Sequence, residues 1–190
     1  MQKFREHAPS RKCKVKFTDY RRYKEFLQND FNHRCGYTDA PDIWFGGKNA
    51  FHIDHFVPWK NHPTKPFLKT DYNNLVYCCS YVNILKSNDE GNYLDPCDND
   101  LNEHFYRDAY GHIFPRKDSP QAIYMYHKLQ LGMERYALIW SLSSLYEKME
   151  RLKFAINKIP DGNKKNKALK IMGELAMEFI DYLKYLSLKQ

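Results

Sequence analysis

The segment from Ala50 to Lys86 constrains the fold more than any other part of the chain. Residues 50–57 predict a β-strand, which Pro58 ends. A polar loop that contains prolines follows over residues 59–72, and residues 74–79 predict a second short strand. A short helix is expected from Ser80 to a point before Gly91. Strand, loop, strand and helix therefore form the predicted central unit.

The flanking segments predict helices and loops. Thr18 is a suitable N-cap for a helix that ends near Asp30, and residues 93–116 read as a loop with a hairpin around residues 104–114. Ser119 and Pro120 open a long helix that Gly132 can interrupt, and a turn at residues 160–163 leads to a last helix. The expected fold is α+β in three parts: an arm and helix (1–34), a core with its following loops (35–117), and an antiparallel helical extension (118–190).

Charge is unevenly distributed along the 190 residues. Residues 1–30 and residues 151–190 each carry nine basic and four acidic side chains, while the segment between them carries twelve and fifteen. An acidic centre between basic ends suits a site that holds a cation and acts on a polyanion. Solvated helix faces explain the same counts equally well.

Neither end of the chain suggests a membrane or an export signal. The first residues contain no apolar run of the secretory type, and no stretch of eighteen apolar residues occurs. We therefore expect a cytoplasmic protein. The odd number of cysteines, five, argues against a disulfide framework in such a compartment.

Four polar residues of the central unit match the needs of phosphodiester hydrolysis, which requires a base for the attacking water and a cation to absorb charge. Asp54 and His55 are adjacent on the first strand and point to opposite sides, so Asp54 can ligate one divalent cation while His55 acts as the base. Asn83 supplies a second oxygen ligand of the kind that Mg²⁺ or Mn²⁺ prefers. Asn74 is expected to orient His55 or its loop.

Two further residues are candidates for substrate binding. Lys86 lies one helical turn beyond Asn83, where it could contact a phosphate. His52 shares a strand face with Asp54 and could assist the cation or the phosphate, although a structural hydrogen bond is equally compatible with its position.

These strings together resemble a known family. The chain looks like the HNH nucleases of the ββα-metal class, in the variant whose third signature residue is asparagine. The strings that carry the resemblance are Cys35 to Thr38, His52 to Pro58, Asn73 to Cys79 and Val82 to Lys86. The resemblance implies that His55 is the general base, that Asp54 and Asn83 hold the metal and that Asn74 positions the base. It covers about fifty residues.

The chain departs from many members of that family at the zinc knuckle. Two Cys-x-x-Cys pairs often hold a structural zinc, but Thr38 and Val82 replace the second member of each pair here. A valine cannot ligate a metal, so a structural zinc is not expected. Cys35 and Cys79 then become small buried residues that pack together.

The order of an HNH core, a Leu-Asp-Pro segment and a helical tail also resembles the small HNH subunits of anti-phage systems such as Septu, which work with an ABC-type ATPase. That resemblance implies an antiviral role and an ATPase partner bound through the C-terminal helices. DNA is the favoured substrate. The alternatives are an RNA or transfer-RNA nuclease, and an inactive module that binds nucleic acid or a partner.

Overall fold

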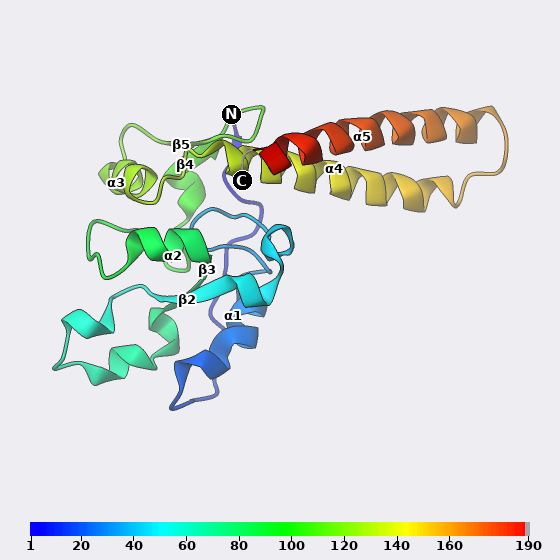
Figure 1. Cartoon of the computed structure of the whole chain (residues 1–190). Helices are drawn as coiled ribbons and strands as arrows, with labels where there is room; N and C mark the ends of the chain where they lie inside the picture. The colour runs from blue at the N-terminus through cyan, green and yellow to red at the C-terminus, as the bar shows by residue number, and fades with distance from the viewer. Residues whose placement is uncertain (189–190) are drawn as a thin grey trace. The chain divides into compact units, whose positions relative to one another are not determined.

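The computed structural model describes residues 1–188 and forms two compact units, Met1–Met133 and Glu134–Gln190. The first unit mixes helices with two small β-sheets, and the second consists of two long helices (Figure 1). The fold is therefore α+β, as expected. Within residues 1–188, every helix is too short or too polar to cross a membrane.

The central unit has the predicted order of elements. Strand β2 (Phe51–His55) pairs antiparallel with β3 (Leu75–Cys79), with His55 opposite Leu75 and Phe51 opposite Cys79. Three short 3-10 helices shape the intervening loop: η4 (Trp59–Asn61), η5 (Pro66–Lys69) and η6 (Tyr72–Asn74). Helix α2 (Ser80–Lys86) follows β3 without a break. Every residue of β3 is buried, so this strand forms the centre of the first unit.

The N-terminal helix begins one residue later than its sequence suggests. Asp19, rather than Thr18, caps it, because the Asp19 carboxylate accepts a hydrogen bond from the backbone N–H of Arg21. The helix starts as the 3-10 turn η1 (Tyr20–Tyr23) and continues as α1 (Lys24–Asp30). Two more 3-10 turns, η2 (Asp42–Phe45) and η3 (Lys48–Ala50), lead into β2.

A second sheet ties the start of the chain to its middle. The predicted hairpin is present as β4 (Phe105–Arg107) and β5 (Ile113–Pro115), preceded by η7 (Leu101–Glu103). The short strand β1 (Gln2–Lys3) adds to its edge, which the sequence did not predict. Buried Arg107 explains the arrangement, since its guanidinium donates to the carbonyls of Phe4, Thr38 and Gly111 at 3.0, 2.8 and 2.7 Å.

The long helix predicted after Ser119 is interrupted. Helix α3 (Pro120–Lys128) ends near Gln130, which has a positive φ of 51°, and α4 (Glu134–Ile156) begins after Gly132. A Cβ atom at Gly132 would lie 2.2 Å from the Tyr126 hydroxyl, so a larger residue there would displace the Tyr126 side chain. Helix α3 thus belongs to the first unit, and the division falls after Met133 rather than before residue 118. In the second unit α4 and α5 (Asn163–Leu188) form an antiparallel pair (Figure 1).

Candidate functional site

The two faces of β2 carry different groups of polar side chains. His52 and Asp54 both reach α2, where they contact Asn83 and Lys86 respectively. His55 lies on the opposite face, against the rings of Tyr20 and Trp59. The predicted separation of Asp54 from His55 is therefore present, because neighbouring residues of a strand point to opposite sides.

His55 has the geometry of a general base. Its Nε2 atom lies 3.0 Å from the backbone carbonyl oxygen of Lys69. A carbonyl can only accept, so this contact places the ring proton on Nε2 and leaves the lone pair on Nδ1. Burial lowers the pKa of His55 below its ordinary value of 6.5, against the opposing effects of the Lys69 carbonyl and Asp54. The imidazole is consequently neutral and able to accept a proton at neutral pH.

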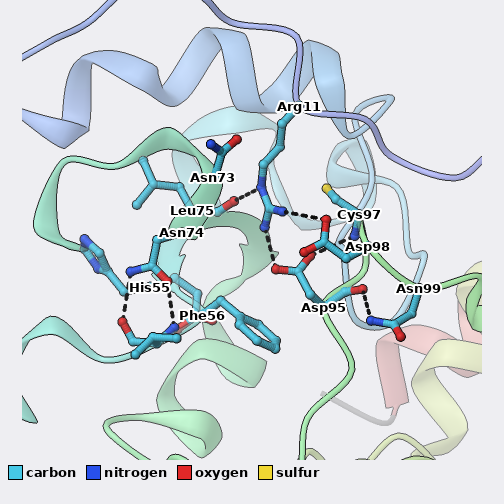
Figure 2. A network of polar contacts seen from close by, with 12 residues as sticks. Arg11, His55, Phe56, Asn73, Asn74, Leu75, Asp95, Cys97, Asp98 and Asn99 are labelled. Atoms are coloured by element: carbon cyan, nitrogen blue, oxygen red, sulfur yellow. Dashed lines mark hydrogen bonds and ion pairs between the residues drawn. The ribbon is translucent and has the colours of Figure 1, made fainter. Parts of the chain in front are cut away.

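Asn74 fixes the loop that holds His55. Its amide nitrogen donates to the carbonyls of Val57 and Leu68, both at 2.9 Å, and its amide oxygen accepts from the N–H of Val57 at 2.8 Å. Figure 2 shows Asn74 beside His55. Because Leu68 precedes Lys69, Asn74 positions the carbonyl that orients the imidazole. Asn74 thus acts on the loop, which is one of the two roles predicted for it.

Asp54 is engaged inside the protein. Its side chain is 4% exposed, its Oδ2 atom accepts a hydrogen bond of 2.6 Å from the Tyr37 hydroxyl, and Lys86 Nζ lies 3.2 Å from the same oxygen. Burial and the neighbouring carboxylate raise the pKa of Tyr37 well above its ordinary value, so the phenol remains a donor. The carboxylate is thereby satisfied by two donors from its own chain.

Lys86 does not face a substrate, contrary to its predicted role as a phosphate contact. The side chain is fully buried, and its ammonium donates to the backbone carbonyls of His55 and Phe56, each at 3.0 Å, as well as to Asp54. The sequence reasoning placed Lys86 correctly on the helix but not its side chain. A lysine whose donors all have internal partners is a structural cation.

The proposed pair of metal ligands is not assembled. The amide of Asn83 lies 3.2 Å from His52 Nδ1, while Asp54 is bound to Tyr37 and Lys86. Residues 1–188 contain no cluster of three or more His, Cys, Asp or Glu side chains placed to hold a metal ion. A divalent cation held by Asp54 and Asn83 stays a prediction, and it would have to replace Lys86 or Tyr37 as a partner of Asp54. The contact of His52 with Asn83 agrees with the structural hydrogen bond that was one of the two roles expected for His52.

The cysteines of the knuckle pack against one another. Cys35 Sγ lies 3.9 Å from Cys79 Sγ, and both side chains are buried. Buried Thr38 and Val82 stand at the positions where the family often has two more thiols. The contact with Cys35, together with burial, raises the pKa of the Cys79 thiol well above its ordinary value. Predicted packing of Cys35 with Cys79 is confirmed, and the expectation about zinc stays a prediction.

Sequence reasoning missed a buried arginine next to the site. Arg11 donates from Nε to the carbonyl of Leu75 at 3.1 Å, and its Nη2 atom lies 2.9 Å from Asp95 Oδ2 (Figure 2). Arg11 and Asp95 side chains are only 6% and 8% exposed. Their separation of 84 residues leaves no local signal. Arg11 thus holds the N-terminal segment against the start of β3, next to Asn74.

Two other histidines take part in local structure. His104 Nδ1 lies 2.8 Å from the hydroxyl of Ser119, the cap of α3, and His112 Nδ1 lies 2.9 Å from Asp108 in the hairpin loop. Both contacts join residues close together in the second sheet and its following turn. These histidines have structural partners away from His55.

Comparison with known proteins yields no relative: no family model, curated protein or solved structure matches the chain. Any assignment of function must therefore come from the geometry around His55 and from the sequence motif.

Proposed function

We propose that this protein is an HNH-type endonuclease that hydrolyses phosphodiester bonds in the cytoplasm, with DNA as the favoured substrate. The proposal rests on the environment of His55. The side chain is a neutral imidazole at the end of a strand, with its tautomer set by the Lys69 carbonyl and with its loop fixed by Asn74. The strand, loop, strand and helix around it agree with the ββα arrangement of that family.

The chemistry assigned to His55 is removal of a proton from the attacking water. Nδ1 accepts the proton as the water oxygen bonds to phosphorus, and the bond from phosphorus to the leaving oxygen breaks. Solvent water then protonates that oxygen, and the imidazolium returns its proton to solvent. A positioned base of this kind contributes about 10² to 10⁴ in rate.

The family resemblance also brings the expectation of one Mg²⁺ or Mn²⁺ ion between Asp54 and Asn83. The ion pair of Asp54 with Lys86 occupies the carboxylate that the cation would need. No step of the reaction given above depends on a metal. Cleavage measured in EDTA and over a range of Mg²⁺ and Mn²⁺ concentrations tests the expectation, and undiminished cleavage in EDTA would show it to be wrong.

The decisive test of the function compares wild-type protein with His55→Ala on plasmid DNA and on total RNA. We expect the variant to lose at least about 100-fold in rate, because no other side chain replaces the base. His112→Ala is the matched control, since it removes an imidazole whose partner is Asp108 in the hairpin loop. Equal cleavage by wild type and His55→Ala would remove the catalytic assignment.

The same experiment separates the rival functions. Cleavage of RNA without cleavage of DNA would identify an RNA or transfer-RNA nuclease. An inactive binding module would cut neither and would keep its biological effect after His55→Ala.

The proposal includes a protein partner, of the ABC-type ATPase class that the Septu resemblance suggests. Helix α5 contains no buried residue and exposes several large apolar side chains: Leu169, Ile171, Met177, Ile180 and Leu183. Several large apolar side chains exposed on one helix favour contact with another protein. Polar substitutions at Ile180 and Leu183 should abolish copurification of an ATPase while nuclease activity remains. Unchanged copurification would exclude this face as the contact.

A further inference from the structure

Two aromatic rings next to His55 suggest which form of nucleic acid it receives. The Tyr20 ring centroid lies 4.8 Å from that of His55, and the Trp59 ring centroid lies 6.4 Å from it on another segment. Tyr20 comes from η1 and Trp59 from η4, and both side chains are partly exposed. The candidate base therefore lies next to two aromatic side chains that solvent can reach.

Each of these rings has a cation beside it. The Arg21 guanidinium carbon lies 5.7 Å from the Tyr20 centroid, and Lys69 Nζ lies 4.9 Å from the Trp59 centroid. An aromatic face next to a flexible cation can bind a base by stacking while the cation binds the adjoining phosphate. Two such combinations lie next to His55.

The two segments that supply the rings are strongly basic. Loop residues 55–70 contain no acidic residue, and residues 12–22 contain only Asp19. Eight basic side chains of these segments are exposed: Lys12, Lys14, Lys16, Arg21, Arg22, Lys60, Lys65 and Lys69. In the described part of the chain none of the eight forms an ion pair with a carboxylate, so their charge is available to a polyanion. In Figure 1 both segments lie at the lower end of the first unit, below β2.

We propose that this surface binds an unpaired nucleic-acid strand, with bases stacked on Tyr20 and Trp59 so that the phosphate between them lies at His55. Paired bases cannot offer their faces to these rings, because both faces are covered within a duplex. The inference rests on the proposed nuclease function, since it names the form of substrate that the same site receives.

Charge alone would give the opposite preference from stacking. Duplex DNA has a higher density of phosphates than a single strand, so a merely basic surface binds duplex at least as tightly. A surface that stacks bases binds the single strand more tightly. Comparison of the two substrates therefore distinguishes the two kinds of surface.

The experiment measures binding of fluorescent 20-nucleotide oligonucleotides to the full-length protein in EDTA, with strand integrity checked on a gel. The probes are single-stranded DNA, RNA of the same sequence and the blunt DNA duplex. We expect tighter binding of the single strands than of the duplex. Tyr20→Ala and Trp59→Ala should each weaken single-strand binding about 5- to 150-fold, the range measured for loss of one stacked base.

Phe67→Ala is the matched control, because Phe67 is 59% exposed on the same basic loop but has no ring contact with His55. It should bind like wild type, and thermal unfolding should show that all three variants fold. A duplex bound as tightly as the single strand, or variants at Tyr20 and Trp59 that bind as wild type does, would overturn the inference. Equal binding of DNA and RNA supports recognition through bases and phosphates. Tighter binding of one of them would show which sugar, deoxyribose or ribose, the surface prefers.

Failure of this inference and failure of the nuclease proposal give different results. Tight, ring-dependent binding of single strands without cleavage under any metal condition would refute only the nuclease proposal. Cleavage that depends on His55 but is equal for duplex and single strand, and unaffected at Tyr20 and Trp59, would refute only the inference.

Discussion

Lys86 and Asp54 form a buried ion pair in which each partner depends on the other. The ammonium is fully buried and Asp54 is 4% exposed, so neither charge can be satisfied by water. The pair holds α2 to the end of β2 at the point where His55 begins its loop. The contribution of this ion pair is therefore structural. Lys86 also donates to the backbone carbonyl of His55, the proposed catalytic residue.

Replacement of Lys86 by methionine should destabilise the protein by about 3–5 kcal/mol, because the Asp54 carboxylate would remain buried without its counter-charge. Chemical denaturation monitored by circular dichroism measures this loss. Lys65→Met on the exposed loop is the control and should change the stability little. An unchanged free energy of unfolding for Lys86→Met would show that the carboxylate finds other compensation.

The titration of His55 predicts the pH dependence of cleavage. Burial lowers the pKa of His55 below 6.5, and the neutral imidazole is the active form, so the acid limb of kcat/KM should have its midpoint below 6.5. The same lowered pKa means that the unfolded chain binds a proton first, so stability is lost as the pH falls from 6.5 toward the folded pKa. Measured pH–rate profiles with a midpoint above 6.5 would contradict this assignment.

At the scale of elements, the loop between β2 and β3 is the part that orients His55. Asn74 binds both ends of the loop segment that runs from Val57 to Leu68. The next carbonyl, that of Lys69, sets the tautomer. Small displacements of this loop would therefore move the imidazole or release its Nε2 proton.

Asn74→Ala should lower kcat/KM by as much as about 100-fold through misplacement of the base, with kcat affected more than KM. It should also cost about 1–3 kcal/mol in stability, since buried loop groups lose their partners. Asn73→Ala is the matched control, because the neighbouring Asn73 is exposed. A purely structural role for Asn74 would reduce stability while the rate of the folded protein and its pH profile stay the same.

The central unit was predictable because its signals are local. The strand pattern of residues 50–57, the stop at Pro58 and the helix start at Ser80 define strand, loop and helix within fewer than forty residues. The sequence also predicted that Asn74 would act on the loop of His55, and its hydrogen bonds to Val57 and Leu68 do so. The sequence did not reveal the inward turn of Lys86, because helical spacing places a side chain on a face without showing what lies opposite. Strand β1 and Arg11 were missed because their partners are 64 or more residues away.

At the scale of the whole molecule, exposed positive charge is concentrated on particular segments of the chain. Residues 12–22 and 55–70 carry eight exposed basic side chains. The same two segments supply the rings that contact His55. Asp54 and Asp95 of the core are instead engaged internally. The formal net charge of +7 is therefore available in part as a binding surface.

Binding of single-stranded DNA should weaken with salt at about 0.7 log units per tenfold salt for each phosphate neutralised. The triple variant Lys60→Ala, Lys65→Ala and Lys69→Ala should reduce that slope by about 2 if each lysine meets one phosphate. Removal of the three exposed cations Lys164, Lys167 and Lys170 in the second unit is the control of equal charge. Equal slopes for both triple variants would show that net charge, and not this surface, governs binding.

Burial of Arg5, Arg11 and Arg107 also has a consequence for how the chain folds. Arg107 donates to the carbonyl of Phe4 across 103 residues, and Arg11 reaches Asp95 across 84. Contacts between such distant positions form slowly, because a long loop must close before they stabilise anything. During synthesis the first dozen residues leave the ribosome early and must wait for the hairpin at residues 105–115. The basic surface that includes residues 12–22 is thus completed late, after most of the first unit has been made.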